Sequence, residues 1–147
     1  MSTSTLKPLR PDLQLIADWI APGSRVLDLG CGDGALLAYL KSHKQISGYG
    51  VEIDHKGVLG CIRNGVDVIQ IDIEDGLSGF QDASFSHAII SQALQAMHST
   101  ERILGEMLRV ADEAIVAPTT PGRAIHTPTI IEHLRAKLSE RPRFCSS

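Results

Sequence analysis

The 147-residue sequence lacks several features that mark specialised classes of protein. No apolar run approaches the ~18 residues that cross a membrane. The first residues, 1–8, include no apolar stretch of the kind that directs secretion. The net charge is −3, which excludes the broad basic surface of a general nucleic-acid-binding protein. We therefore expect a cytoplasmic protein that binds neither membranes nor nucleic acid.

Cysteine is scarce, and its spacing excludes two kinds of site. The three cysteines, Cys31, Cys61 and Cys145, are odd in number and include no CxxC pair. This pattern argues against a disulfide framework and against a zinc site. The six histidines form no HExxH or other paired-ligand spacing. We therefore expect no metal cofactor.

Short apolar segments alternate with helix-like apolar stripes along most of the chain. The pattern predicts strands at residues 25–29, 48–53, 66–70, 85–90 and 113–117, and helices at 13–20, 35–40, 55–64 and 100–110. Asp54 and Thr100 are predicted helix caps, whereas Gly57 and Gly60 weaken the third helix. Such alternation predicts an α/β domain with a parallel sheet, in the order 3-2-1-4-5, flanked by helices on both faces.

The segment Asp28-Leu-Gly-Cys-Gly-Asp-Gly34 joins the first predicted strand to the following helix. Glycines at such a turn allow positive φ angles and let a ligand approach the backbone closely. In a parallel sheet, this turn lies at the edge where ligands usually bind. The sequence therefore predicts a small-molecule site around this glycine loop (residues 28–34).

Two classes of cofactor fit the glycine spacing. The GxGxxA pattern that begins at Gly30 satisfies a loose dinucleotide fingerprint, and Glu52 stands 22 residues after Gly30. A diphosphate, however, would meet Asp28 and Asp33 at this turn. A carboxylate ~4 Å from a phosphate costs about 4 kcal/mol at an effective dielectric near 20, whereas a helix terminus offers an anion at most ~2 kcal/mol. The charges favour S-adenosylmethionine, which has a cationic sulfonium and no phosphate.

Acidic residues at the ends of the second and third predicted strands fit the same cofactor. Glu52 could accept hydrogen bonds from both ribose hydroxyls, and Asp72 could accept the adenine amino proton while its neighbouring isoleucines cover the ring. The predicted cofactor site consists of Asp28, Gly30, Cys31, Gly32, Glu52, Ile53, Asp72, Ile73 and Ser91.

The segment after the fourth predicted strand limits the class of methyl acceptor. It reads Ser91-Gln-Ala-Leu, which differs from the Asn/Asp-Pro-Pro-aromatic segment of base-amino methyltransferases and therefore disfavours nucleic acid as the acceptor. Ser91, Gln92 and Gln95 are placed where an acceptor could lie. Methyl transfer to a good nucleophile depends mainly on alignment and desolvation, so no catalytic side chain is assigned.

Several segments carry a family resemblance. Residues 26–34 resemble motif I of the Rossmann-like S-adenosylmethionine-dependent methyltransferases. Residues 12–20, 48–54, 64–70, 91–95 and 106–110 narrow the resemblance to the MetW family of methionine biosynthesis proteins. The resemblance implies a cytoplasmic protein that supports homoserine O-acyltransferase. It also implies a cofactor site that includes Asp28, Gly30, Gly32, Glu52 and Asp72.

Two other functions remain open at this point. A catalytic methyltransferase acting on a small metabolite would use the same cofactor and the same loop. A nicotinamide oxidoreductase is supported by the dinucleotide fingerprint alone.

Charge and composition change at Pro118. Residues 119–147 hold five basic residues against two acidic ones, whereas the rest of the chain is acidic. The family resemblance does not extend far past Ala117, where relatives continue into acceptor-side sequence. We expect a cofactor-binding domain at 1–118 and an atypical basic tail at 119–147, with one helix from Thr127 and without the closing strands of a full methyltransferase sheet.

Overall fold

The computed structural model describes residues 8–91 and 97–117, in which helices and strands alternate along the chain. In chain order the elements are α1 (Pro11–Trp19), β1 (Arg25–Leu29), α2 (Ala35–Lys44), β2 (Ser47–Val51), α3 (His55–Arg63), β3 (Val68–Ile69), the 3₁₀ helix η1 (Ile73–Asp75), β4 (Phe85–Ser91), α4 (Thr100–Val110) and β5 (Ala111–Ala117). The predicted alternation of strands and helices is confirmed.

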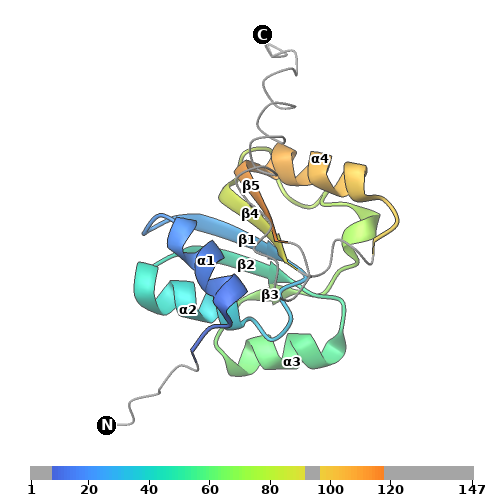
Figure 1. Cartoon of the computed structure of the whole chain (residues 1–147). Helices are drawn as coiled ribbons and strands as arrows, with labels where there is room; N and C mark the ends of the chain where they lie inside the picture. The colour runs from blue at the N-terminus through green and yellow to red at the C-terminus, as the bar shows by residue number, and fades with distance from the viewer. Residues whose placement is uncertain (1–7, 92–96, 118–147) are drawn as a thin grey trace.

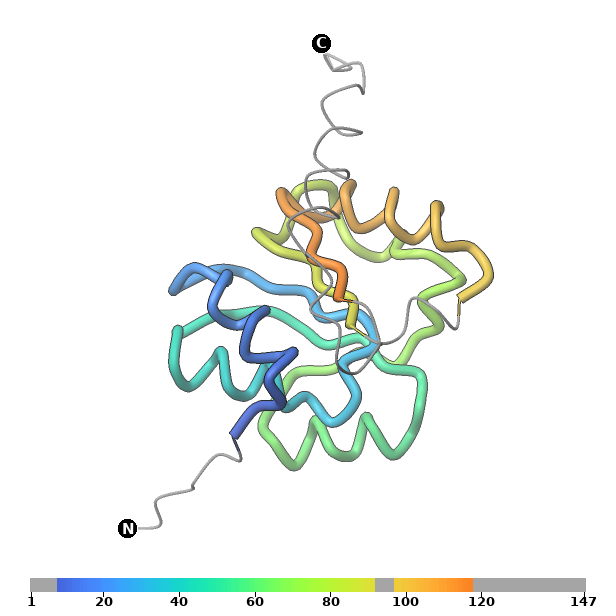
Figure 2. The backbone as a smooth tube through the Cα atoms, viewed as in Figure 1, coloured from blue at the N-terminus to red at the C-terminus, as the bar shows by residue number. Residues whose placement is uncertain are grey.

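The described strands form one parallel sheet in the order β3-β2-β1-β4-β5, as predicted from the sequence. Helices α1, α2 and α3 cover one face of the sheet, and α4 covers the other (Figure 1). The backbone trace crosses from the first face to the second after β3 (Figure 2). The result is a three-layer α/β/α arrangement, which buries a parallel sheet on both faces.

Neighbouring residues of one strand belong to different hydrophobic cores. In β1, Val26 packs with α1 and α2, whereas Leu27 and Leu29 pack with α4. Both cores are closed, since these three side chains have no solvent exposure. Asp28 has the same orientation along the strand as Val26, because side chains alternate between the faces of a sheet. The sheet therefore directs the Asp28 carboxyl group to the face that α1, α2 and α3 cover, where His87 of β4 is a second buried polar side chain.

Some element boundaries differ from the prediction. Strand β2 ends at Val51, so Glu52 and Ile53 lie beyond the sheet. Strand β3 is only two residues long, since only Val68 and Ile69 pair with β2. Ser99, not Thr100, is the N-cap of α4. Asp54 is the N-cap of α3 as predicted, and its carboxylate accepts from the Lys56 backbone N–H at 3.4 Å.

The predicted basic tail, its helix and the proposed lack of closing strands lie outside the described residues. Within residues 8–91 and 97–117, no helix combines the length and the apolar character that a bilayer span requires.

Candidate functional site

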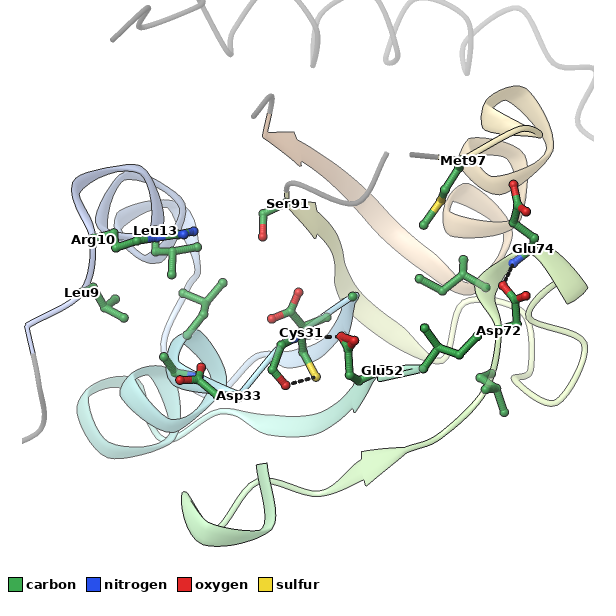
Figure 3. Close-up of a pocket in the computed structure, with 18 of the residues that line it drawn as sticks. Leu9, Arg10, Leu13, Cys31, Asp33, Glu52, Asp72, Glu74, Ser91 and Met97 are labelled. Carbon is green, nitrogen blue, oxygen red and sulfur yellow. Dashed lines mark hydrogen bonds between the residues drawn. The ribbon is translucent and has the colours of Figure 1, made fainter. Parts of the chain in front are cut away.

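A cleft of about 660 Å³ opens at the carboxyl ends of β1, β2 and β4. This volume lies within the range of small-molecule sites. Figure 3 shows lining side chains that come from the glycine loop, from the ends of the strands and from the start of α1. The lining includes all nine residues predicted for the cofactor site: Asp28, Gly30, Cys31, Gly32, Glu52, Ile53, Asp72, Ile73 and Ser91.

The glycine loop has the backbone conformation that its sequence predicts. Gly30, Gly32 and Gly34 have φ angles of 70°, 58° and 76°, which are strained for other residues. The loop is also tied to the sheet, because the Val51 carbonyl accepts from the backbone N–H groups of Gly30 and Cys31 at 2.7 and 3.1 Å. The ligand edge of the sheet is therefore a fixed, open turn.

Glu52 holds the glycine loop from the end of β2. Its Oε2 accepts from the Gly32 backbone N–H at 3.0 Å, and its Oε1 accepts from the Asp54 N–H at 3.3 Å. Each carboxylate oxygen can accept more than one hydrogen bond. The half-buried Glu52 is thus oriented by the backbone and still able to accept hydroxyl donors from a ligand.

Asp28 is the most perturbed acid of the cleft. Its side chain is buried, and its Oδ1 has no hydrogen-bond partner among the described residues. Burial raises the pKa of Asp28 from 3.8 to about 7, and the nearby charge of Glu52 adds to the effect. An unpartnered buried carboxylate is costly, so Asp28 favours a ligand that brings a positive charge or a hydrogen-bond donor.

Asp72 follows β3 and lies on the side of the cleft opposite Leu13 (Figure 3). Its Oδ1 accepts from the Glu74 backbone N–H at 3.0 Å and so caps η1. Glu74 in turn accepts from the backbone N–H of His98, which precedes α4. Ile53 and Ile73 are apolar residues of the cleft lining. This end combines a fixed carboxylate with surfaces suited to a flat ring.

Sequence reasoning missed the residues that α1 brings to the cleft. Leu9, Arg10 and Leu13 lie along one side, opposite Asp72 (Figure 3). In the sequence, the Arg10-Pro11-Asp12 segment indicates only the start of a helix, and no local pattern places it beside the cleft. Among the described lining residues, Arg10 is the one Lys or Arg beside five acids: Asp28, Asp33, Glu52, Asp72 and Glu74.

Helix α3 approaches the glycine loop through two glycines. A Cβ at Gly57 would lie 2.8 Å from the Glu52 Cγ, and a Cβ at Gly60 would lie 2.8 Å from the Asp33 Cβ. These glycines therefore permit close packing, although they lower the helix propensity of α3. Asp33 is exposed, and its Oδ1 accepts from the Ala35 N–H at 3.1 Å.

On the acceptor side, only one of the three predicted polar residues lies within the described part of the chain. Ser91 ends β4 and lines the cleft, but Gln92 and Gln95 lie outside the described residues. Among the described residues, no cluster of three or more His, Cys, Asp or Glu side chains has a metal-binding arrangement. The geometry instead presents an acid-lined cleft with one basic side.

Comparison with known proteins gives a family match. The family model described as "Methionine biosynthesis protein MetW" matches residues 10–124. A curated protein of Rhodopirellula baltica, "Bifunctional methionine biosynthesis protein MetXA/MetW", is 38% identical over 117 residues. That alignment covers 74% of this chain and 19% of the relative, so the chain spans about a fifth of that protein's length.

Solved structures share the fold. A SAM-dependent methyltransferase from Thermotoga maritima, described as a possible histamine N-methyltransferase, is 27% identical with a TM-score of 0.59 and covers 71% of this chain and 48% of its own. A SAM-dependent methyltransferase from Geobacter sulfurreducens, in complex with S-adenosyl-L-homocysteine, is 21% identical with a TM-score of 0.58 and covers 78% and 51%. The Rossmann-like methyltransferase fold predicted from the sequence is confirmed.

Proposed function

Because the chain belongs to the MetW family of methionine biosynthesis proteins, we propose that its cleft binds S-adenosylmethionine and that the protein supports homoserine O-acyltransferase in the cytoplasm. The proposed cofactor-binding domain is residues 1–118. The unpartnered, buried Oδ1 of Asp28 in an acid-lined cleft is the observation that carries the cofactor assignment. When bound, this cofactor supplies an activated methyl group on a cationic sulfur.

The acids have separate roles in the proposal. Glu52 accepts hydrogen bonds from the ribose hydroxyls, since the Gly32 and Asp54 N–H groups already orient its carboxylate. Asp72 accepts the adenine amino proton, and Ile53 and Ile73 cover the ring. Asp28, at the start of the glycine loop, faces the sulfonium and amino groups of the cofactor's methionine portion. The remaining proposed contacts are Gly30, Cys31, Gly32 and Ser91, which line the same cleft.

Arg10 supplies a positive charge to the acid-lined cleft. The methionine portion of the cofactor carries a carboxylate, which the acids alone would repel. Arg10 lies on the side of the cleft formed by α1 and forms an exposed ion pair with Asp12 at 3.1 Å. A guanidinium suits bidentate binding of a carboxylate. We assign Arg10 to the carboxylate end of the cofactor.

A catalytic methyltransferase of a small metabolite is the second candidate function. It is supported by Ser91, which ends β4 and lines the cleft. In this proposal, Ser91 contacts the acceptor. The matching solved structures that are described as SAM-dependent methyltransferases support the same reading. Formation of S-adenosylhomocysteine with a cell metabolite extract would separate this function from an accessory role.

The cofactor proposal is tested by calorimetry with S-adenosylmethionine, S-adenosylhomocysteine and NADH. We expect the first two to bind and NADH not to bind, because a diphosphate would meet the cleft acids. Glu52→Gln should weaken binding by about 10–100-fold, since a hydrogen bond to a charged group contributes ~1.5–3 kcal/mol. Asp67→Asn is the matched control, because Asp67 is exposed and lies before β3, away from the cleft.

Tight NADH binding with no S-adenosylmethionine binding would contradict the cofactor assignment. An equal loss of affinity in Glu52→Gln and Asp67→Asn would contradict the role of Glu52.

The partner proposal has a direct test. The matched relative joins MetXA and MetW in one named bifunctional protein, which supports association between the two activities. We expect this chain to co-purify with homoserine O-acyltransferase and to change its specific activity on mixing. The control is the same enzyme with an unrelated protein of similar size. No complex at micromolar concentrations and no change in acyltransferase rate would contradict the partner.

A further inference from the structure

Two cysteines that are 30 residues apart in the sequence meet at the glycine loop. The Sγ atoms of Cys31 and Cys61 lie 3.5 Å apart, and the Cys61 thiol donates to the Gly32 carbonyl oxygen at 3.2 Å. Cys31 is half-buried and lines the cleft, whereas Cys61, in α3, has no solvent exposure. The thiol pair therefore links the wall of the cleft to the helix behind it.

The surrounding backbone leaves space for both sulfur atoms. A Cβ at Gly50 would lie 2.4 Å from the Cys31 Sγ, and a Cβ at Gly34 would lie 3.1 Å from the Cys61 Sγ. Gly57 and Gly60 bring α3 against the loop in the same way. Since disulfide sulfurs are about 2.05 Å apart, the thiols need to approach by roughly 1.5 Å to form a bond.

We propose that Cys31 and Cys61 form a redox modification site. A disulfide between the two cysteines prevents a ligand from binding in the cleft, and a bound ligand prevents the disulfide from forming. Only the identity of that ligand rests on the proposed function. Cys31 is the sulfur that an oxidant meets first, because Cys61 is fully buried behind it. A bound ligand would cover Cys31, and a disulfide would draw the glycine loop towards α3 and away from its position on Glu52.

The chemical step is thiol–disulfide exchange with a low-molecular-weight disulfide. The Cys31 thiolate attacks one sulfur of glutathione disulfide, which forms a mixed disulfide and releases one glutathione thiol. The Cys61 thiolate then attacks the Cys31 Sγ and releases the second glutathione thiol. The two protein thiols lose two protons and two electrons in total, and the reagent disulfide is reduced to two thiols.

The environment makes this exchange slow at neutral pH. Burial raises the pKa of the Cys31 thiol, and the charge of Asp28 raises it further. Burial also raises the pKa of Cys61. Because the thiolate is the reacting form, we expect the rate of disulfide formation to increase with pH. The disulfide itself is uncharged, so the neighbouring acids do not oppose the product.

The test uses the full chain, freed of reductant and incubated with glutathione disulfide. We expect a protein two hydrogen atoms lighter by intact mass spectrometry. Trypsin should then release a disulfide-linked pair of peptides, 26–41 and 57–63. Saturating S-adenosylmethionine should slow this reaction at least about tenfold, and the oxidised protein should bind it at least about tenfold more weakly until it is reduced.

Single cysteine variants separate the steps. Cys61→Ser should stop at the mixed disulfide, with one glutathione retained on Cys31. Cys145→Ser is the matched control, because it removes the third cysteine and should leave the linked pair unchanged. Linkage of Cys31 or Cys61 to Cys145 instead would overturn the proposal, as would no disulfide, or equal rates with and without bound ligand. Failure of S-adenosylmethionine to bind the reduced protein would overturn the proposed function, whereas the linked peptides need no ligand and still decide the cysteine pair.

Discussion

Gly48→Ala is expected to remove a large part of the free energy of unfolding. Gly48 lies in β2 opposite Val26 of β1, with a φ angle of 138°. A Cβ at this position would lie 1.8 Å from the Val26 carbonyl oxygen and 2.7 Å from the Val26 carbonyl carbon. Both atoms belong to the central strand, so they cannot rotate away as a side chain does. We expect a loss of more than ~4 kcal/mol from a total stability of ~5–15 kcal/mol.

The measurement is urea denaturation followed by circular dichroism. Gly79→Ala is the matched control, because a Cβ at Gly79 meets no atom within 4 Å. A substitution of this kind is expected to change the free energy of unfolding by no more than ~0.5 kcal/mol. If Gly48→Ala unfolds at the same urea concentration as Gly79→Ala, the close approach of β1 and β2 at this residue is wrong.

The order of elements could be predicted from the sequence because local patterns determine it. The apolar stripe of Leu36, Leu37 and Leu40 predicts a helix face, and all three side chains are buried in α2. The short extent of β3 could not be predicted, because it depends on pairing with β2 and not on the apolar character of residues 66–70. Strand ends are set by tertiary partners, which local periodicity does not contain.

The strand-end residues of the site could be predicted for a different reason. Parallel strands place their carboxyl ends at one edge of the sheet, so Asp28, Glu52 and Asp72 converge once the sheet order is known. Arg10 and Cys61 could not be placed, because Arg10 lines the cleft from the start of α1 and Cys61 meets the loop from α3, and both depend on how these helices pack. The packing of α3 depends on Gly57 and Gly60, which in the sequence only weaken a helix.

Asp28→Asn is expected to change the pH dependence of stability. Asp28 has a pKa of about 7 in the folded protein, against an ordinary value of 3.8, chiefly because it is buried. Between these pH values the folded protein keeps a proton that the unfolded chain has released. The free energy of unfolding of the native protein therefore falls as pH rises from about 4 to about 7, by ~4 kcal/mol at ~1.4 kcal/mol per pKa unit.

The asparagine variant has no such titration, so its stability relative to the native protein should rise over this pH range. At pH 4 it should be no more stable than the native protein, because its amide protons need partners in a buried position. At pH 8 it should be more stable, by about 1–3 kcal/mol. Urea denaturation at both pH values measures the difference, with Asp67→Asn as the exposed control. Parallel pH curves for Asp28→Asn and the native protein would contradict the raised pKa.

The same substitution should lower the affinity for S-adenosylmethionine if the proposed function holds, because in that proposal the charge that destabilises the free protein also attracts the cationic ligand. Binding to the native protein at pH 6 should release a proton, since the cation favours ionised Asp28. Calorimetry in buffers of different ionisation enthalpy detects that proton, and Asp28→Asn should abolish its release. A variant that gains stability above pH 7 and loses affinity would show that the Asp28 carboxylate contributes to ligand binding and lowers the stability of the free protein. Unchanged affinity with increased stability would mean that the ligand does not contact this carboxylate.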